Sequence, residues 1–560
     1  MKKFEILFNQ CNFLTIKAPQ TYIKMKFNYE NLCSSWKWGI PTLYNIGRDC
    51  TDKYAKSESH GNKIALYWES EEGEIKRFTF AELSSLTNQI GNALLSLGFQ
   101  KGDRLLIRLP NLPEFPLVFL GAIKIGAVPI PSSTMLTAEE IGCLLDDSQA
   151  KGVITTPELY EAVEVNRGHH KKFKHVLVVE QPIPSACVGF SELINKCSEN
   201  LTIAETKAED VAYICYTSGT TGFPKGVVHA QHALIGRDPA ALYWQALKPN
   251  YIVMHAGKLN WTYTLGTGCL DPWRYGCSTV IYGGEHNPKK FFDLIAKYRV
   301  NVFMAVPTVY RQMLRIADEF DPDLSSLHHA LSAGEHLSEE LFLSWKNKLG
   351  VELYDGLGMS EFSYYLSDMP GMPIKPGSPG KPQPGHRSTL IDEEGKEVGV
   401  GEIGVLATPK DDPGIMLDYW QRPQETEKMF RGNWFVSGDF FYKDEDGYFW
   451  LVGREDDIIT TFGYRVSPFE VERVLSEHPI VNECAVTGID VGEDKTITTA
   501  FVVLKDSRHE LEKLKEDLLD HAHRRLAKYK CPREIIFLES LPKTPNGKIK
   551  RKVLRDGFNF

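Results

Sequence analysis

The residues best suited to do chemistry lie in one short loop, TSGTTGFPKG, at positions 217–226. Its three glycines let the main chain approach a polyanion, its four hydroxyls can donate hydrogen bonds, and its lysine supplies a positive charge. The loop follows VAYICY, an apolar run typical of a buried strand. We therefore predict that it binds phosphate groups. The residues concerned are Thr217, Ser218, Gly219, Thr220, Thr221, Gly222, Lys225 and Gly226.

The spacing of this loop differs from that of the common nucleotide P-loop, which is G-x-x-x-x-G-K-[ST]. Here Lys225 follows Phe223 and Pro224, and it is followed by Gly226 rather than by a hydroxyl residue. A kinase-like P-loop is therefore excluded by its own motif. A flexible surface loop of the same composition is the simpler alternative.

The stretch YTSGTTGFPKGVVH resembles the phosphate-loop signature of the adenylate-forming superfamily, which includes acyl-CoA synthetases, stand-alone adenylation domains and luciferases. Further stretches resemble the superfamily's other motifs, in the same order, and the resemblance covers the chain from about Met25 to Arg555. These stretches are SAGEHL (332–337), DGLGMSE (355–361), WFVSGD (434–439), LVGREDDIITTFGYRV (451–466) and LPKTPNGKIKR (541–551).

The resemblance implies a ligase that activates a carboxylic acid with ATP, releases pyrophosphate, and passes the acyl group from acyl-AMP to coenzyme A. A carboxylate is already ionised at neutral pH, so the first step needs alignment and charge neutralisation rather than a general base. ATP, coenzyme A and Mg²⁺ are the small molecules implied. The alternatives are an adenylation enzyme that loads a carrier protein, and an inactive nucleotide-binding regulator.

The resemblance assigns roles to single residues. Glu361 is expected to hold Mg²⁺, and Ser360, where threonine is commoner, is expected to contact phosphate. Lys548 is expected to offset charge at the α-phosphate, and Asp439 to bind the ribose hydroxyls, with Arg454 reaching ribose or phosphate. Intact residues at these positions argue against an inactive regulator.

Other positions are expected to bind the nucleotide or to control motion. Asp456 matches the hinge between two domains, and Gly463 a passage without a side chain for the pantetheine arm. Further nucleotide contacts are expected from Gly334, Glu335, His336, Asp355, Gly356 and Arg465.

The segment KLNWTYTLG (258–266) lies where relatives have aromatic residues of the acyl pocket, so Trp261 and Tyr263 are candidates, with core packing as the alternative. Gly358 stands where acetyl-CoA synthetases carry a tryptophan that closes their pocket. We therefore expect a pocket deeper than acetate requires, for a short-to-medium-chain fatty or aryl acid. The absence of an attached carrier domain favours coenzyme A as the acceptor.

The spacing of apolar residues along the sequence predicts the helices and strands that must position these residues. Helical and strand patterns alternate between Phe78 and Leu353, which predicts an α/β fold with doubly wound parallel sheets. We expect residues 1–25 to be a disordered extension. Residues 26–455 are expected to form an N-terminal adenylation domain, with a small β-barrel at 378–455, and residues 456–560 a mobile α+β domain. A capping box is expected at Ser467 and Glu470.

Composition excludes several classes of protein. The 560 residues are 42% hydrophobic and 24% charged, as in an ordinary globular chain, and the net charge of −9 argues against nucleic-acid binding. The most apolar stretch, from Pro116, is too short to span a bilayer and contains Lys124. Eleven scattered cysteines fit reduced thiols in the cytoplasm. The sequence leaves open whether the protein is a monomer or a homodimer.

Overall fold

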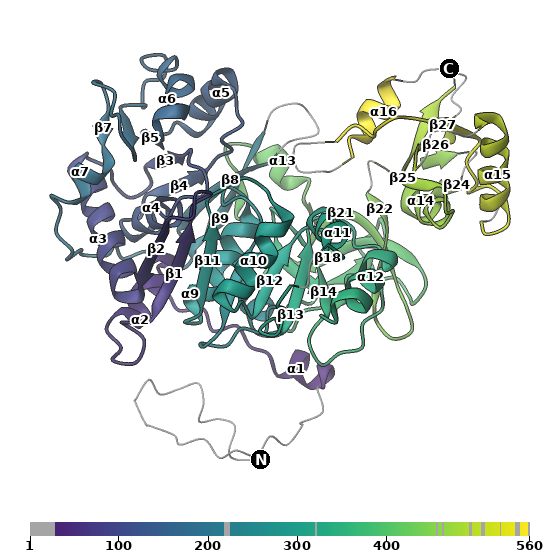
Figure 1. Ribbon diagram of the computed structural model, residues 1–560, viewed down its shortest axis with the longest axis horizontal. Helices are drawn as coiled ribbons and strands as arrows, with labels where there is room; N and C mark the ends of the chain where they lie inside the picture. Colours follow the sequence, from purple (N-terminus) through teal and green to yellow (C-terminus); the bar gives the residue numbers. More distant parts are fainter. Residues whose placement is uncertain are drawn as a thin grey trace.

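The computed structural model describes residues 28–217, 224–319, 322–454, 457, 459–461, 464–491, 496–505, 510–526, 528–543 and 549–557. Most of the described chain forms two sheets with helices around them, and the last hundred residues form a smaller group of elements beside them (Figure 1). The α/β class predicted from the sequence is confirmed.

The larger sheet has nine strands in the described chain, in the order β16-β15-β14-β13-β12-β10-β11-β1-β2. Its central pairs are parallel, and β2, β15 and β16 join it antiparallel at the two edges. The strand bounds are β1 Ile64–Glu69, β2 Ile75–Thr79, β10 Ile252–His255, β11 Ser278–Tyr282, β12 Val302–Ala305, β13 His329–Ala333, β14 Leu353–Met359, β15 Ser363–Ser367 and β16 Lys381–Pro382. Helices α10 (Pro288–Tyr298), α11 (Pro307–Ile316) and α12 (Glu339–Leu349) cover one face (Figure 1).

The second sheet is fully parallel, in the order β4-β3-β5-β6-β7. Its strands are β3 Arg104–Ile107, β4 Val128–Pro131, β5 Gly152–Thr155, β6 His175–Val178 and β7 Val188–Gly189. Helices α3 (Phe80–Ser96) and α4 (Glu114–Lys124) share one core with β1 and β3, and α5 (Ala138–Ser148) and α6 (Pro157–Glu164) pack on the other side. The apolar stretch from Pro116 is α4 followed by β4, and among the described helices none is long and apolar enough to cross a membrane.

The predicted phosphate loop connects two antiparallel strands rather than a strand and a helix. Strands β8 (Val211–Thr217) and β9 (Lys225–Ala230) form a hairpin, and β19 (Asp418–Tyr419) extends it in the order β19-β9-β8. A five-stranded antiparallel sheet forms in the segment predicted as a β-barrel. Its strands are β17 Thr389–Ile391, β18 Ile403–Pro409, β20 Phe430–Arg431, β21 Trp434–Lys443 and β22 Phe449–Arg454.

The C-terminal elements bury a core of their own. Helices α14 (Pro468–Ser476) and α15 (Leu511–His523) pack on the sheet β25-β26-β27, and Leu475, Val502 and Leu518 are among the buried residues. The strands are β25 Val481–Asp490, β26 Thr496–Leu504 and β27 Glu534–Phe537, and the last helix is α16 Arg551–Gly557.

Only half of the capping box expected at α14 is present. The Ser467 hydroxyl accepts a hydrogen bond from the Glu470 backbone N–H (3.2 Å), as predicted. The Glu470 carboxylate, however, accepts a bond from Lys530 Nζ (2.7 Å), so the side chain that would close the box is drawn to a tertiary partner instead.

One buried carboxylate ties the large sheet to its covering helix. Glu69, at the end of β1, is 1% exposed, and its oxygens accept hydrogen bonds from Lys290 Nζ (2.8 Å), Lys297 Nζ (2.7 Å) and the Tyr298 hydroxyl (2.6 Å) of α10. Burial opposes ionisation, but these three donors outweigh it, so the pKa of Glu69 lies below its usual value.

We predict that Glu69→Gln lowers the free energy of unfolding by roughly 1.5–3 kcal/mol at pH 7, the usual worth of hydrogen bonds to a charged group. Because the folded-state pKa is depressed, this stabilisation is present above the unfolded-state pKa of about 4.3 and is lost as the pH falls below it. Urea unfolding at pH 7 and at lower pH measures the difference between wild type and variant. Asp293→Asn, in the exposed pair with Lys289, is the control and should change stability by less than about 1 kcal/mol.

Candidate active site

The motif glutamate lies in a tight turn between two antiparallel strands. Strand β14 pairs with β15 so that Met359 faces Ser363, and the three residues Ser360, Glu361 and Phe362 form the turn between them. Glu361 is half-buried, and its Oε1 accepts a hydrogen bond from the Tyr419 hydroxyl (2.7 Å). Among the residues that the structure describes, none forms a hydrogen bond with its Oε2.

A buried histidine forms a hydrogen bond to the same turn. His229 of β9 stacks on Tyr213 of β8, with ring centroids 4.8 Å apart, and its Nε2 lies 2.8 Å from the Ser360 carbonyl oxygen. Burial lowers the pKa of His229 to about 4, so the ring is neutral at pH 7. Because a carbonyl oxygen only accepts, Nε2 must carry the hydrogen. The hairpin that bears the phosphate loop is thus bonded directly to the turn that bears Glu361.

Tyr419 makes a second connection between the two motifs. The Lys225 ammonium lies 5.3 Å from the centroid of the Tyr419 ring, whose hydroxyl binds Glu361. Lys225 also forms an ion pair with Glu425 of α13 (Pro423–Glu427). Thr217 faces Lys225 across the hairpin, while residues 218–223, which contain the other predicted loop residues (Ser218, Gly219, Thr220, Thr221, Gly222), lie outside the described chain.

The expected nucleotide contacts at residues 334–336 directly follow β13. Gly334 has φ +87°, a conformation that favours glycine, and Glu335 turns back to bind Thr308 at the start of α11, with Oε2 accepting from the backbone N–H (3.1 Å) and the hydroxyl (2.8 Å). The His336 ring lies 6.2 Å from that of Phe469 in α14, so this segment contacts the C-terminal elements.

Two buried carboxyl groups lie close together, that of Asp355 in β14 and that of Asp368 directly after β15. The Asp355 backbone N–H donates to Asp368 Oδ2 (3.1 Å), and the two residues are 7% and 1% exposed. Burial, and for Asp355 also the neighbouring charge of Asp368, raises the pKa of both carboxyl groups well above the usual value. Gly356 is required here, because a Cβ would lie 2.6 Å from the Trp244 ring.

The two expected ribose contacts lie opposite each other in the antiparallel sheet. Asp439 of β21 is the register partner of Arg454 of β22, although fourteen other residues separate them in the sequence. The Asp439 backbone N–H binds the Ser437 hydroxyl (3.1 Å). Arg465 pairs through its backbone with Thr460 in the hairpin of β23 (Ile459–Thr461) and β24 (Tyr464–Val466). Asp456, Gly463 and Lys548 lie outside the described residues.

The two predicted pocket aromatics have different environments. The Tyr263 ring in α8 (Thr262–Leu265) lies 5.4 Å from Tyr364 and 4.3 Å from His255, and 6.3 Å from Trp244, in an aromatic cluster behind β14 and β15. Trp261 is 45% exposed. Tyr263 thus packs beside Tyr364 of β15, in the strand pair next to Glu361, whereas Trp261 is largely exposed.

The space expected beside Gly358 is filled. A Cβ on residue 358 would lie 2.1 Å from the Ser363 carbonyl oxygen and 2.7 Å from the Tyr364 ring. The expectation that a missing side chain leaves room at this point is therefore wrong. Gly358 is needed for the close approach of β15, and Tyr364 takes the space that a larger side chain would need.

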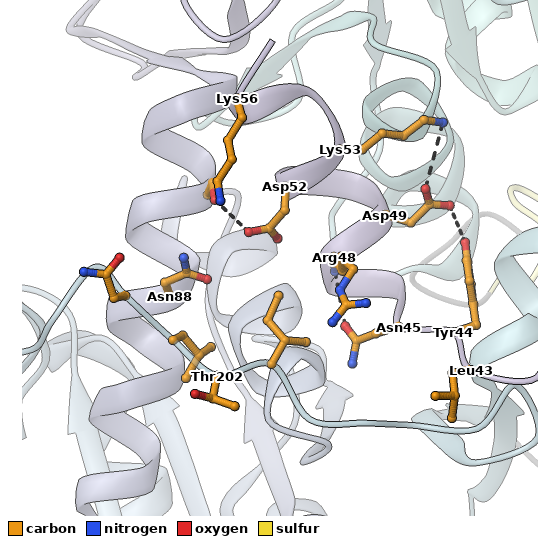
Figure 2. A pocket seen from close by; sticks show the side chains of 14 residues that line it. Leu43, Tyr44, Asn45, Arg48, Asp49, Asp52, Lys53, Lys56, Asn88 and Thr202 are labelled. Carbon is orange, nitrogen blue, oxygen red and sulfur yellow. Dashed lines mark hydrogen bonds and ion pairs between the residues drawn. The ribbon is translucent and has the colours of Figure 1, made fainter. Parts of the chain in front are cut away.

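A polar pocket of about 730 Å³ lies elsewhere on the molecule (Figure 2). Arg48, Lys56 and Asn88 lie around it, and Lys53 is directed toward Asp49. The acidic residues of its wall are already paired, Asp52 with Lys124 (2.6 Å) and Asp49 with Arg274 (3.1 Å). Its lining contains none of the motif residues, so this pocket is separate from the site described above.

The sequence motifs did not identify Tyr419, His229 or Glu425 as site residues. His229 ends the phosphate-loop motif, but nothing in its local sequence predicts a bond to Ser360. Tyr419 and Glu425 lie in DYWQRPQETEKMF, a stretch whose link to Lys225 depends on the pairing of β19 with β9.

Comparison with known proteins agrees with this arrangement. A family model described as AMP-binding enzyme matches residues 54–420, and one described as AMP-binding enzyme C-terminal domain matches residues 470–548. The human mitochondrial acyl-coenzyme A synthetase ACSM3 is 34% identical over 94% of this chain and 92% of its own length. The acetyl-coenzyme A synthetase of Bacillus subtilis (strain 168) is 37% identical over 91% of this chain and 90% of its own length.

A solved structure is also similar along nearly the whole chain. The anthranilate CoA ligase AuaEII in complex with anthranoyl-AMP has a TM-score of 0.84 and 32% identity, and the match covers 93% of this chain and 98% of that chain. The order of the motifs in the sequence, their arrangement around Tyr419 and the similarity to these proteins over nearly the whole chain therefore agree. The protein belongs to the AMP-binding enzyme family.

Proposed function

We propose that the protein is an ATP-dependent carboxylate–CoA ligase. The acid's carboxylate oxygen attacks the α-phosphorus, the bond to pyrophosphate breaks, and acyl-AMP forms. The thiol of coenzyme A then attacks the acyl carbon, AMP leaves, and the thiol proton passes to solvent. The observation that carries the proposal is that Lys225 and Glu361, from motifs far apart in the sequence, both lie against Tyr419.

The described residues supply alignment and charge rather than proton transfer. The Lys225 ammonium would bind the phosphates after giving up its ion pair with Glu425. Glu361 would hold Mg²⁺ through Oε2, to which no described residue binds, because Mg²⁺ prefers oxygen ligands, and the bound ion would neutralise phosphate charge. Ser360 would offer its hydroxyl to phosphate, and Asp439 its carboxylate to the ribose, with Arg454 and Arg465 beside the nucleotide.

The C-terminal elements would serve the two half-reactions in turn. Lys548 would offset charge at the α-phosphate during adenylation, and rotation at Asp456 would then bring Gly463 to the passage for the thiol. The separate core around Leu475 and Leu518 supports this proposal, because a group of elements with its own core can move as a unit. The hinge would divide an adenylation domain, residues 26–455, from a mobile domain, residues 456–560.

The aromatic cluster supports an acid larger than acetate. Tyr263 is half-buried and packs against the buried side chains of Tyr364, Trp244 and His255. In the proposed pocket the Tyr263 ring would contact the hydrocarbon chain or ring of the acid and exclude water from it. Burial lowers the pKa of His255 to about 3, so it adds no positive charge to this pocket. We propose a short-to-medium-chain fatty or aryl acid as the substrate and, from the cysteine spacing, the cytoplasm as the location.

The direct test is acyl-CoA formation over a panel of acetate, butyrate, hexanoate, octanoate and benzoate. We expect acid-dependent AMP release with coenzyme A present, and a higher kcat/KM for one of the larger acids than for acetate. If the thioester forms only on a pantetheinyl carrier protein, the enzyme loads a carrier instead. If no acid supports AMP release, the proposed function is wrong.

We predict that Glu425→Gln tightens the binding of MgATP. The carboxylate competes with phosphate for Lys225, and a partly exposed ion pair is worth roughly 0.2–1 kcal/mol, so the Kd should fall about 1.4- to fivefold. Isothermal titration calorimetry with MgATP measures this Kd for wild type and variant. Glu427→Gln removes the same charge from the exposed face of the same helix and is the matched control. Equal effects of the two variants would mean that the gain is a general effect of net charge.

A further inference from the structure

A buried ion pair lies behind the turn that carries Glu361. Arg237 ends the 3₁₀ helix of residues 231–237, and Asp271 begins helix α9 (Asp271–Arg274). The guanidinium binds the carboxylate at two points, Nε to Oδ1 (2.7 Å) and Nη2 to Oδ2 (2.6 Å), and the residues are 5% and 1% exposed. Because removing two charges from water is costly, such a pair is weak evidence for stability and calls for another explanation.

The guanidinium is held in one orientation by its surroundings. A Cβ on Gly266 would lie 2.4 Å from Nη2, so the guanidinium packs directly against the backbone at this glycine. Gln245 Nε2 donates to Asp271 Oδ2 (2.7 Å) and fixes the carboxylate, and the Tyr364 ring lies 5.7 Å from the guanidinium carbon. The remaining nitrogen, Nη1, can therefore point in one direction only.

That nitrogen donates to the hydroxyl of Ser363 at 2.5 Å. Ser363 has φ +48°, in the left-handed region that costs a residue with a Cβ roughly 1–2 kcal/mol. It follows Glu361 by two residues and pairs with Met359 across the turn. Its carbonyl oxygen occupies the space over Gly358. The left-handed backbone at Ser363 thus sets the path by which the chain leaves Glu361 and enters β15.

We propose that Arg237 is a positioning residue for Glu361: its bond to the Ser363 hydroxyl holds the left-handed turn that presents the Glu361 carboxylate to the metal–nucleotide. The inference rests on the proposed function for the identity of that ligand. Arg237 touches neither the nucleotide nor the metal. It acts through the backbone of Ser363, and the fixed pair with Asp271 gives the bond its direction.

Two substitutions of Ser363 distinguish positioning of the turn from a direct requirement for the Ser363 hydroxyl. Both Ser363→Ala and Ser363→Gly remove the bond to Arg237, but only alanine keeps the steric cost of a positive φ, since glycine adopts this region freely. We expect Ser363→Ala to weaken MgATP binding about five- to tenfold, because the turn leaves the competent conformation. Ser363→Gly should stay within about twofold of wild type.

The measurements are isothermal titration of MgATP and the Mg²⁺ concentration needed for half-maximal ATP binding, with thermal unfolding to show that each variant is folded. Replacing Arg237 would leave Asp271 buried without its positively charged partner and risks unfolding, so Ser363 is the position to vary. Arg299→Ala and Arg299→Gly form the control pair, since Arg299 has φ +52° at the exposed end of α10, and neither should alter MgATP binding.

Three outcomes decide the proposal. Weak binding by the alanine variant with near-normal binding by the glycine variant supports it. Equal loss in both variants would show that the hydroxyl itself, and not the turn, is required, and normal binding in both would show that the turn does not depend on Arg237; either result overturns it. A wild-type protein that binds MgATP but forms no thioester contradicts only the proposed function.

Discussion

The hydrogen bond from the Tyr419 hydroxyl to Glu361 is the contact on which the arrangement of the site depends. Tyr419 comes from a two-residue strand, β19, that is in register with β9, so its position is set by the same sheet that carries Lys225. Its ring lies beside the lysine and its hydroxyl binds the glutamate. One side chain therefore fixes the distance between the cation and the carboxylate that an adenylating enzyme must bring to one triphosphate.

The rest of the site supports this contact from two other directions. His229 binds the Ser360 carbonyl from the phosphate-loop hairpin, and Arg237 binds Ser363 from the buried pair with Asp271. The three hydrogen bonds end at residues 360, 361 and 363, which lie in the turn or directly after it. Such a turn can hold a carboxylate in place before the ligand arrives, which lowers the cost of ordering it during binding.

Much of the fold could be predicted from the sequence, because buried parallel strands are short apolar runs. STVIYG and NVFMAV are β11 and β12, and the helix after the second run is α11. An apolar run does not reveal the direction of its neighbour, so the antiparallel pairing of β8 with β9 was not predicted. The family motifs singled out Glu361, Lys225 and Asp439 as candidate site residues.

The residues that position these groups could not be predicted in the same way. Tyr419 and Arg237 act through partners distant in the sequence, and no local pattern distinguishes them from core residues. Gly358 shows the limit of inference from a missing side chain, since the space beside it is filled by the backbone of Ser363. The incomplete capping box at Ser467 has a similar cause, because Lys530 binds the side chain of Glu470.

The central claim is that Tyr419 joins the lysine and the glutamate into one adenylating site. Acid-dependent exchange of labelled pyrophosphate into ATP, measured for wild type and Tyr419→Phe over a range of Mg²⁺ concentrations, tests it most directly. A hydrogen bond to a charged group is worth about 1.5–3 kcal/mol, so loss of the hydroxyl alone should slow exchange roughly ten- to a hundredfold and raise the Mg²⁺ requirement. Exchange at the wild-type rate, with an unchanged Mg²⁺ dependence, would contradict the account.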